Sequence, residues 1–106
     1  MAMKINIQAP NLELTPALTE FIEQKIGGLD KFLKKFHPED VLARVDVGRS
    51  TRHHRHGNVY HVDVNLLLPG GTVRAAYDDE DVRKAIDAVK EKLQREIKRF
   101  KEIHSR

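Results

Sequence analysis

The sequence feature that most constrains the fold is the segment VYHVDVNLLLPGGTVRAAY, residues 59–77. Apolar residues at every second position on both sides of Pro69-Gly70-Gly71 predict two strands, because strand side chains alternate between the faces of a sheet. Glycine accepts the positive φ angle that a tight hairpin turn requires. The side chains expected to face the core are Tyr60, Val62, Val64, Leu66, Leu68, Val73, Ala75 and Tyr77.

Two further strands and two helices are predicted around this hairpin. Residues 4–8 and 40–48 alternate in the same way. Residues 15–36 repeat apolar side chains at three- and four-residue steps, which predicts one helix starting at Thr15-Pro16 and ending before His37-Pro38. Gly27-Gly28 should weaken this helix by about 1 kcal/mol per glycine relative to alanine. A long final helix follows the acidic cluster at residues 78–81, whose carboxylates suit a helix N-terminus.

The element order is therefore β-α-β-β-β-α, an α+β fold. Strands with one apolar face and helices with one apolar stripe bury these surfaces together only if both helices cover the same side of a four-stranded sheet. A chain of 106 residues is expected to form a single domain, 1–106.

Composition narrows the class of protein. The chain has no cysteine, which excludes disulfides, thiol catalysis and thiolate metal sites. No apolar run approaches the roughly 20 residues that span a bilayer, and the N-terminus lacks a secretory pattern, so a cytoplasmic location without membrane contact is expected. No paired carboxylates, phosphate-binding glycine loop or Ser-His-Asp order stands out, and His61 with Asp63 is interpreted as surface polarity. An enzyme with a cofactor or small-molecule substrate is not expected.

The positive charge is concentrated in the last quarter of the chain. Residues 82–106 hold nine Lys and Arg against four Asp and Glu, although the whole chain carries only +3. Lys92, Arg95 and Arg99 should follow one edge of the final helix's apolar stripe, and Arg83, Lys90 and Lys101 the other. An anionic partner, with nucleic acid the commonest, is one interpretation. A solvated helix stabilised by neighbouring acids is the alternative.

Lys25 breaks the pattern of the first helix. It projects close to the middle of the apolar stripe, between Phe21 and Leu29. A charge against a core is costly unless it finds a partner, so Lys25 either extends past the core edge or is partly buried. Local rule-breaking of this kind is expected at functional positions.

The stretch RSTRHHRHGN, residues 49–58, is unusually basic. A metal site is not expected, because no acidic residue lies between Asp46 and Asp63 and three arginines repel a cation. A pH switch would suit histidine, but no bistable element is evident. We expect Arg49, Arg52 and Arg55 to extend an RNA-facing surface; a hydrophilic hairpin tip without function is the alternative.

Three segments together resemble one family. They are LELTPALTEFIEQKI, VYHVDVNLLLPGGTVRAAYDDED and AIDAVKEKLQREIKRFK, in the same order, and the likeness covers nearly all of residues 3–101. The chain resembles the short ribosome hibernation-promoting factors and ribosome-associated translation inhibitors of bacteria. The resemblance implies a fold like that of double-stranded RNA-binding domains. It also implies binding to the small ribosomal subunit, in the mRNA and tRNA channel near the decoding region. By occupying this channel in stationary phase or stress, the protein is expected to silence translation.

The resemblance also implies which residues bind rRNA. Lys25, Lys92 and Arg95 match basic residues of the family, Arg99 falls where a lysine is usual, and Arg83 replaces a usual tyrosine. The expected rRNA-binding residues are Lys25, Lys84, Lys90, Lys92, Arg95, Arg99, Arg49, Arg52 and Arg55. Whole ribosomes and ribosome dimers are further candidate partners. A generic double-stranded RNA-binding module and a protein-interaction regulator are the alternative functions.

Overall fold

The computed structural model describes residues 3–50 and 59–104. The predicted order of elements is confirmed, with two short 3-10 helices added between α1 and β2. The elements are β1 (Lys4–Gln8), α1 (Pro16–Gly27), η1 (Gly28–Phe32), η2 (Pro38–Asp40), β2 (Leu42–Ser50), β3 (Val59–Leu68), β4 (Gly71–Asp79) and α2 (Val82–His104).

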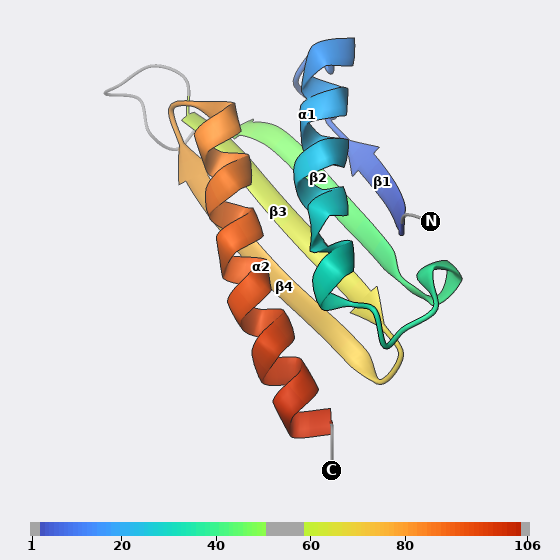
Figure 1. The fold of residues 1–106 in the computed structure, drawn as a ribbon. Helices are drawn as coiled ribbons and strands as arrows, with labels where there is room; N and C mark the ends of the chain where they lie inside the picture. The colour runs from blue at the N-terminus through green and yellow to red at the C-terminus, as the bar shows by residue number, and fades with distance from the viewer. Residues whose placement is uncertain (1–2, 51–58, 105–106) are drawn as a thin grey trace.

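The four strands form one sheet in the order β1-β2-β3-β4. β1 runs parallel to β2, so α1 serves as the crossover connection between them, and the other two pairs are antiparallel. Both helices lie on the same face of this sheet (Figure 1). The predicted α+β fold, with two helices covering one face, is therefore confirmed.

The core lies between the sheet and the two helices. The alternating positions of β2 and β3 supply one side of the core, and the apolar stripes of α1 and α2 supply the other. Within the described residues, no polar or charged side chain is buried. The fully buried large side chains are Ile22, Ile26, Leu29, Val45, Val47, Val62, Val64, Leu66, Ile86, Val89, Leu93 and Ile97.

Tyr77 was expected to be buried, and this prediction is wrong: the residue is 39% exposed. Tyr77 pairs with the buried Val62 and so lies on the helix-covered face. However, β4 is an edge strand, so a neighbouring strand flanks Tyr77 on one side only. Lys92 lies over the Tyr77 ring, with its Nζ 5.1 Å from the ring centroid.

The first helix is shorter than expected. α1 begins as predicted, with the Thr15 hydroxyl accepting a hydrogen bond from the Leu18 amide at 3.2 Å and Pro16 in the first helical position. It ends at Gly27 instead of continuing to residue 36, and the next turn tightens into η1. Two adjacent glycines favour such a break because each loses much backbone entropy in a helix. The apolar side chains beyond it still pack on the core.

The β3–β4 turn confirms the prediction from the Pro-Gly-Gly sequence. Leu68 pairs with Gly71, so Pro69 and Gly70 form a two-residue loop. Among the described residues, Gly70 alone has a positive φ, at +99°. The end of α2 closes over this turn: a Cβ on Gly71 would lie 3.0 Å from the Phe100 ring. The hairpin tip and α2 therefore depend on glycine for their contact.

Candidate nucleic-acid interface

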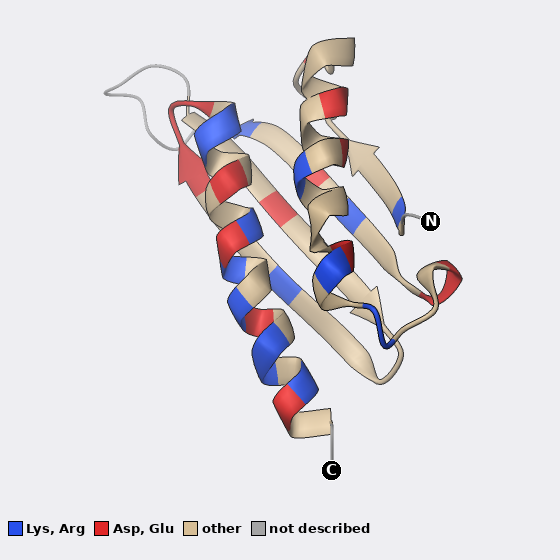
Figure 2. Cartoon of the chain, in the orientation of Figure 1, with Lys and Arg blue, Asp and Glu red and all other residues tan. Residues whose placement is uncertain are grey.

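The helical face of the molecule carries an excess of positive charge. α2 alone bears eight Lys and Arg side chains and four Asp and Glu. Its apolar stripe is buried against the sheet, so these charges are confined to the outer surface and to the two edges of the helix. Figure 2 shows the Lys and Arg positions following α2, with others on α1 and η1 beside it. We call this surface, formed by α1, η1 and α2, the helical face.

Lys25 is the link between the two helices. Its Nζ lies 3.3 Å from a carboxylate oxygen of Asp87 on α2, and its side chain is 36% exposed. The same ammonium group lies 5.5 Å from the Phe21 ring centroid. Of the two placements expected for Lys25, the structure shows partial burial at the core edge. The ion pair with Asp87 compensates the charge of Lys25 at the edge of the core. The sequence alone did not reveal this partner.

Arg83 packs on the same ring from the other helix. Its guanidinium carbon lies 4.7 Å from the Phe21 centroid. A guanidinium stacked on an aromatic face keeps its donors directed to the sides, and these suit phosphate oxygens. Sequence reasoning placed Arg83 on the correct edge of α2 but left it out of the binding residues. The relevant signal was the position of Phe21 on the apolar stripe of α1.

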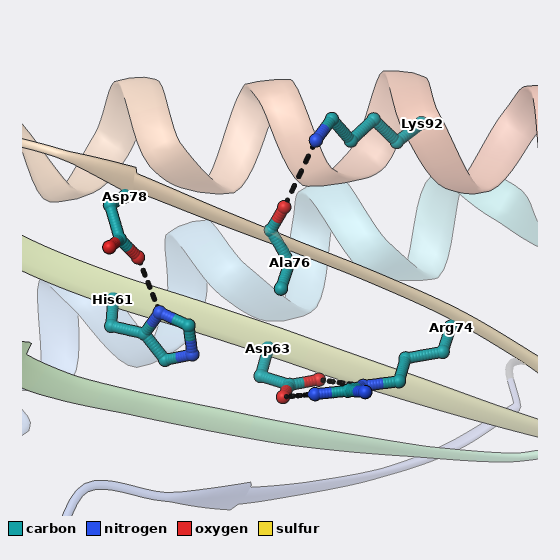
Figure 3. A network of polar contacts seen from close by, with 6 residues as sticks. All are labelled: His61, Asp63, Arg74, Ala76, Asp78 and Lys92. Carbon is teal, nitrogen blue, oxygen red and sulfur yellow. Dashed lines mark hydrogen bonds and ion pairs between the residues drawn. The ribbon is translucent and has the colours of Figure 1, made fainter.

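Lys92 lies on the opposite edge of α2, against β4. Its Nζ donates a hydrogen bond to the carbonyl oxygen of Ala76 at 3.2 Å (Figure 3). Ala76 is on the edge strand, opposite Asp63, so Lys92 occupies an acceptor on the free side of β4. A lysine has three N–H donors, which leaves two for a phosphate.

The structure places the other expected residues as follows. Lys84, Arg95 and Arg99 are exposed on α2, and Arg99 is 3.6 Å from Glu96 in an i,i+3 pair. Lys90 approaches Gly28: a Cβ on that glycine would lie 3.4 Å from the lysine Nζ. The expected residues that the structure describes therefore do not form one compact cluster. Seen from α2, Lys25 and Lys90 lie toward α1 and Lys92 lies toward β4.

Arg49 is the one arginine of the basic stretch that lies within the described residues. It is exposed at the end of β2, opposite Tyr60. Asn11 holds its backbone, accepting from the Arg49 amide at 3.0 Å and donating to its carbonyl at 3.2 Å. Arg52 and Arg55 lie outside the described residues, together with the three histidines of that stretch.

The opposite face of the sheet has a different electrostatic character. The Arg74 guanidinium donates two hydrogen bonds to Asp63, at 3.1 and 2.6 Å, and His61 contacts Asp78 (Figure 3). The hydrogen bond from Arg74 lowers the pKa of Asp63 below its usual value, against the opposing effect of burial. Two side-chain pairs on this face therefore lie across strands β3 and β4, whereas α2 on the helical face carries eight Lys and Arg against four Asp and Glu.

Metal binding by residues 3–50 and 59–104 would require several ligand side chains close together. Within these ranges, no group of three or more His, Asp or Glu side chains is arranged to hold a metal ion. No described helix is long and apolar enough to cross a membrane. What the described surface offers is a rigid array of cations, which suits binding to an extended anion.

Fold and surface together define the class: a small α+β domain that presents a cationic two-helix face. The family follows from comparison. The model of the Sigma 54 modulation protein / S30EA ribosomal protein family matches residues 5–105, and the chain belongs to this family.

Several relatives resemble the chain over almost its whole length. It is 35% identical over 99 residues to the ribosome hibernation promotion factor of Lactococcus lactis subsp. cremoris, covering 93% of this chain and 50% of that protein. It is 30% identical over 101 residues to the ribosome hibernation promoting factor of Salmonella typhimurium, covering 94% and 95%. The crystal structure of the Thermus thermophilus Protein Y N-terminal domain superposes with a TM-score of 0.73 at 29% identity, covering 94% and 99%. The chain thus spans about half the length of some relatives and nearly all of others.

Proposed function

We propose that this chain is a ribosome hibernation factor that binds the small ribosomal subunit through its helical face. The names of its relatives support a role in ribosome hibernation. The site proposed is the channel of mRNA and tRNA near the decoding region. Binding there silences translation in stationary phase or stress because the protein occupies the space that tRNA needs. The mechanism requires no catalytic residue, cofactor or small-molecule substrate.

One observation carries this proposal: the outer surface and edges of α2 present eight Lys and Arg side chains against four Asp and Glu. Folded RNA is recognised mainly through its backbone and shape, so a fixed array of Lys and Arg is sufficient for binding. Lys25, Lys92, Arg95 and Arg99 supply such an array from two helices that share one core. Lys84, Lys90, Arg49, Arg52 and Arg55 are proposed to add contacts around it.

Sedimentation with vacant ribosomes tests the proposal. The protein should pellet with small subunits at low ionic strength and be displaced by tRNA. If about six cations neutralise phosphates, log affinity against log salt should have a slope of about −4 to −5. Equal affinity for any RNA duplex would indicate a generic RNA-binding module. A partner bound without salt dependence would indicate a protein-interaction regulator.

A further inference from the structure

A groove between η1 and α2 lies on the helical face and plays no part in the contacts described so far. Its volume is about 420 Å³. The residues that line it are Phe32, Gln94, Arg95, Ile97, Lys98 and Lys101. Two are apolar, one is an amide and three are cations; none is Asp or Glu. The groove therefore combines an apolar surface with a positively charged rim.

Its two walls are held together. The Nζ of Lys101 on α2 donates a hydrogen bond to the Phe32 carbonyl of η1 at 2.9 Å. Ile97 is fully buried and belongs to the core beneath the groove. Phe32 is partly buried, and the exposed Lys31 places its Nζ 5.4 Å from the centroid of the Phe32 ring. Lys31 does not line the groove, and the hydrogen bond from Lys101 to Phe32 joins the two walls before any ligand arrives.

The lining selects the chemistry of the ligand. An aromatic ring offers stacking to a planar group, and cations on the rim offer pairing to a negative charge. The Gln94 amide has both donors and an acceptor, which matches the hydrogen-bonding edge of a nucleobase. A nucleotide combines these three properties in one ligand: a planar base, a hydrogen-bonding edge and a negative charge. The volume is also within the range of pockets that enclose small ligands.

We infer that this groove binds one unpaired nucleotide of RNA. The base stacks on Phe32 within the groove, its edge reaches Gln94, and the flanking phosphate pairs with Arg95 and Lys98. The inference rests on the proposed function, because the RNA strand would belong to the folded rRNA that the helical face contacts. The groove would add a contact with an unpaired base, whereas the other cations of the helical face would contact the RNA backbone.

Two RNA hairpins with identical stems test the inference, one fully paired and one with a single bulged adenosine. Binding is measured by fluorescence anisotropy at two salt concentrations. The bulged hairpin should bind about tenfold more tightly, which is the order of effect expected for stacking one base on an aromatic side chain. This preference should persist when salt is raised, because stacking is not an ionic contact, although both affinities fall.

Matched variants locate the effect. Phe32→Leu removes the ring and should abolish the preference for the bulge. Phe36→Leu makes the same change at a neighbouring, partly buried phenylalanine that does not line the groove, and should leave the preference unchanged. Gln94→Ala, on the surface of α2, should reduce the preference for the bulged hairpin several-fold. If Phe32→Leu does not fold, this second variant provides the test. Thermal unfolding of each variant establishes which ones retain the fold.

Equal affinity for the two hairpins, or a preference that survives both Phe32→Leu and Gln94→Ala, overturns the inference. Failure here is distinct from failure of the proposed function. A protein that pellets with vacant ribosomes and is displaced by tRNA, yet does not discriminate between the hairpins, retains the proposed function and loses only the nucleotide site.

Discussion

The ammonium group of Lys92 lies 3.2 Å from the carbonyl oxygen of Ala76, so this cation is held against the edge strand. Fixing a lysine in advance reduces the side-chain entropy that it loses when it binds a phosphate. Arg95, one turn further along α2, is exposed. The Lys92 side chain is therefore already positioned before a partner binds, whereas the exposed Arg95 side chain would have to be ordered on binding.

Replacing both Lys92 and Arg95 by alanine should weaken ribosome binding. Each lost phosphate contact removes about 0.7 to 0.9 from the slope of log affinity against log salt, so the pair should remove about one to two units. The measurement is sedimentation across a salt series. The control is Lys4→Ala with Arg44→Ala, two exposed cations of the uncovered sheet face. Equal slopes for the two double variants would contradict the assignment of the helical face.

Asp87 forms an ion pair with Lys25, and removing the Asp87 charge should change the stability of the protein and its ribosome affinity in opposite directions. Asp87→Asn should lower the free energy of unfolding by about 0.2 to 1 kcal/mol, the range for partly exposed pairs. It should also raise ribosome affinity at low salt, because Lys25 is released and one negative charge is lost from the helical face. Urea denaturation and sedimentation measure the two effects. A variant that is less stable but binds no more tightly would restrict Lys25 to a structural role.

The hairpin turn predicts a backbone effect at Gly70. Its φ of +99° is strained for any residue with a Cβ, so Gly70→Ala should lower the free energy of unfolding by about 1 to 2 kcal/mol. Gly70→Asn should cost less, since asparagine tolerates positive φ better. Urea denaturation of the three proteins measures the difference. Alanine and asparagine variants of equal stability would contradict this explanation.

The Asp63–Arg74 pair predicts a dependence of stability on pH. The folded protein lowers the pKa of Asp63, mainly through its hydrogen bond with Arg74, whereas the unfolded chain has an ordinary value near 4. The unfolded state therefore binds the proton more readily, and the pair stabilises the fold above pH of about 4. This contribution is lost as pH falls through the lowered pKa of the folded protein.

Replacing Arg74 by glutamine isolates this effect. Arg74→Gln should be less stable than the unmodified protein at pH 7, and the difference should shrink as the solution is acidified below pH of about 4. Urea denaturation at several pH values checks this. Arg44→Gln is the control, because Arg44 lies on the same sheet face and has no ion pair within residues 3–50 and 59–104. A difference that stays constant with pH would exclude the pair as its source.

Most of the fold was predictable because each strand and helix carries its own periodicity. The alternation of residues 59–77 and the turn glycines are local signals, and the structure confirms them. The end of α1 at Gly27 was missed because the apolar stripe continues past it, and a 3-10 turn keeps those side chains on the same side. Tyr77 was misplaced because alternation identifies the face of a strand but not whether that strand lies at an edge.

The membership of the candidate site stays a prediction from the sequence, and its arrangement could not be predicted. The position of Lys25 on the helix stripe left two placements open, and the structure shows a side chain that is 36% exposed. Its partner Asp87 is far away in sequence and becomes a neighbour only when α1 and α2 pack side by side. The bond from Lys92 to Ala76 depends in the same way on how α2 crosses β4. Such contacts are tertiary, so no local pattern reports them.

The contact of Lys92 with β4 has a consequence for self-association. Unprotected outer strands allow a second copy to extend a sheet by hydrogen bonding, the route to polymers and aggregates. Here one outer strand, β1, is only five residues long, and the other has the Ala76 acceptor occupied by a cation. Both features disfavour the addition of a strand from a second copy to the edges of this sheet. Substituting Lys92 would remove a charge and also leave a position where chains can join.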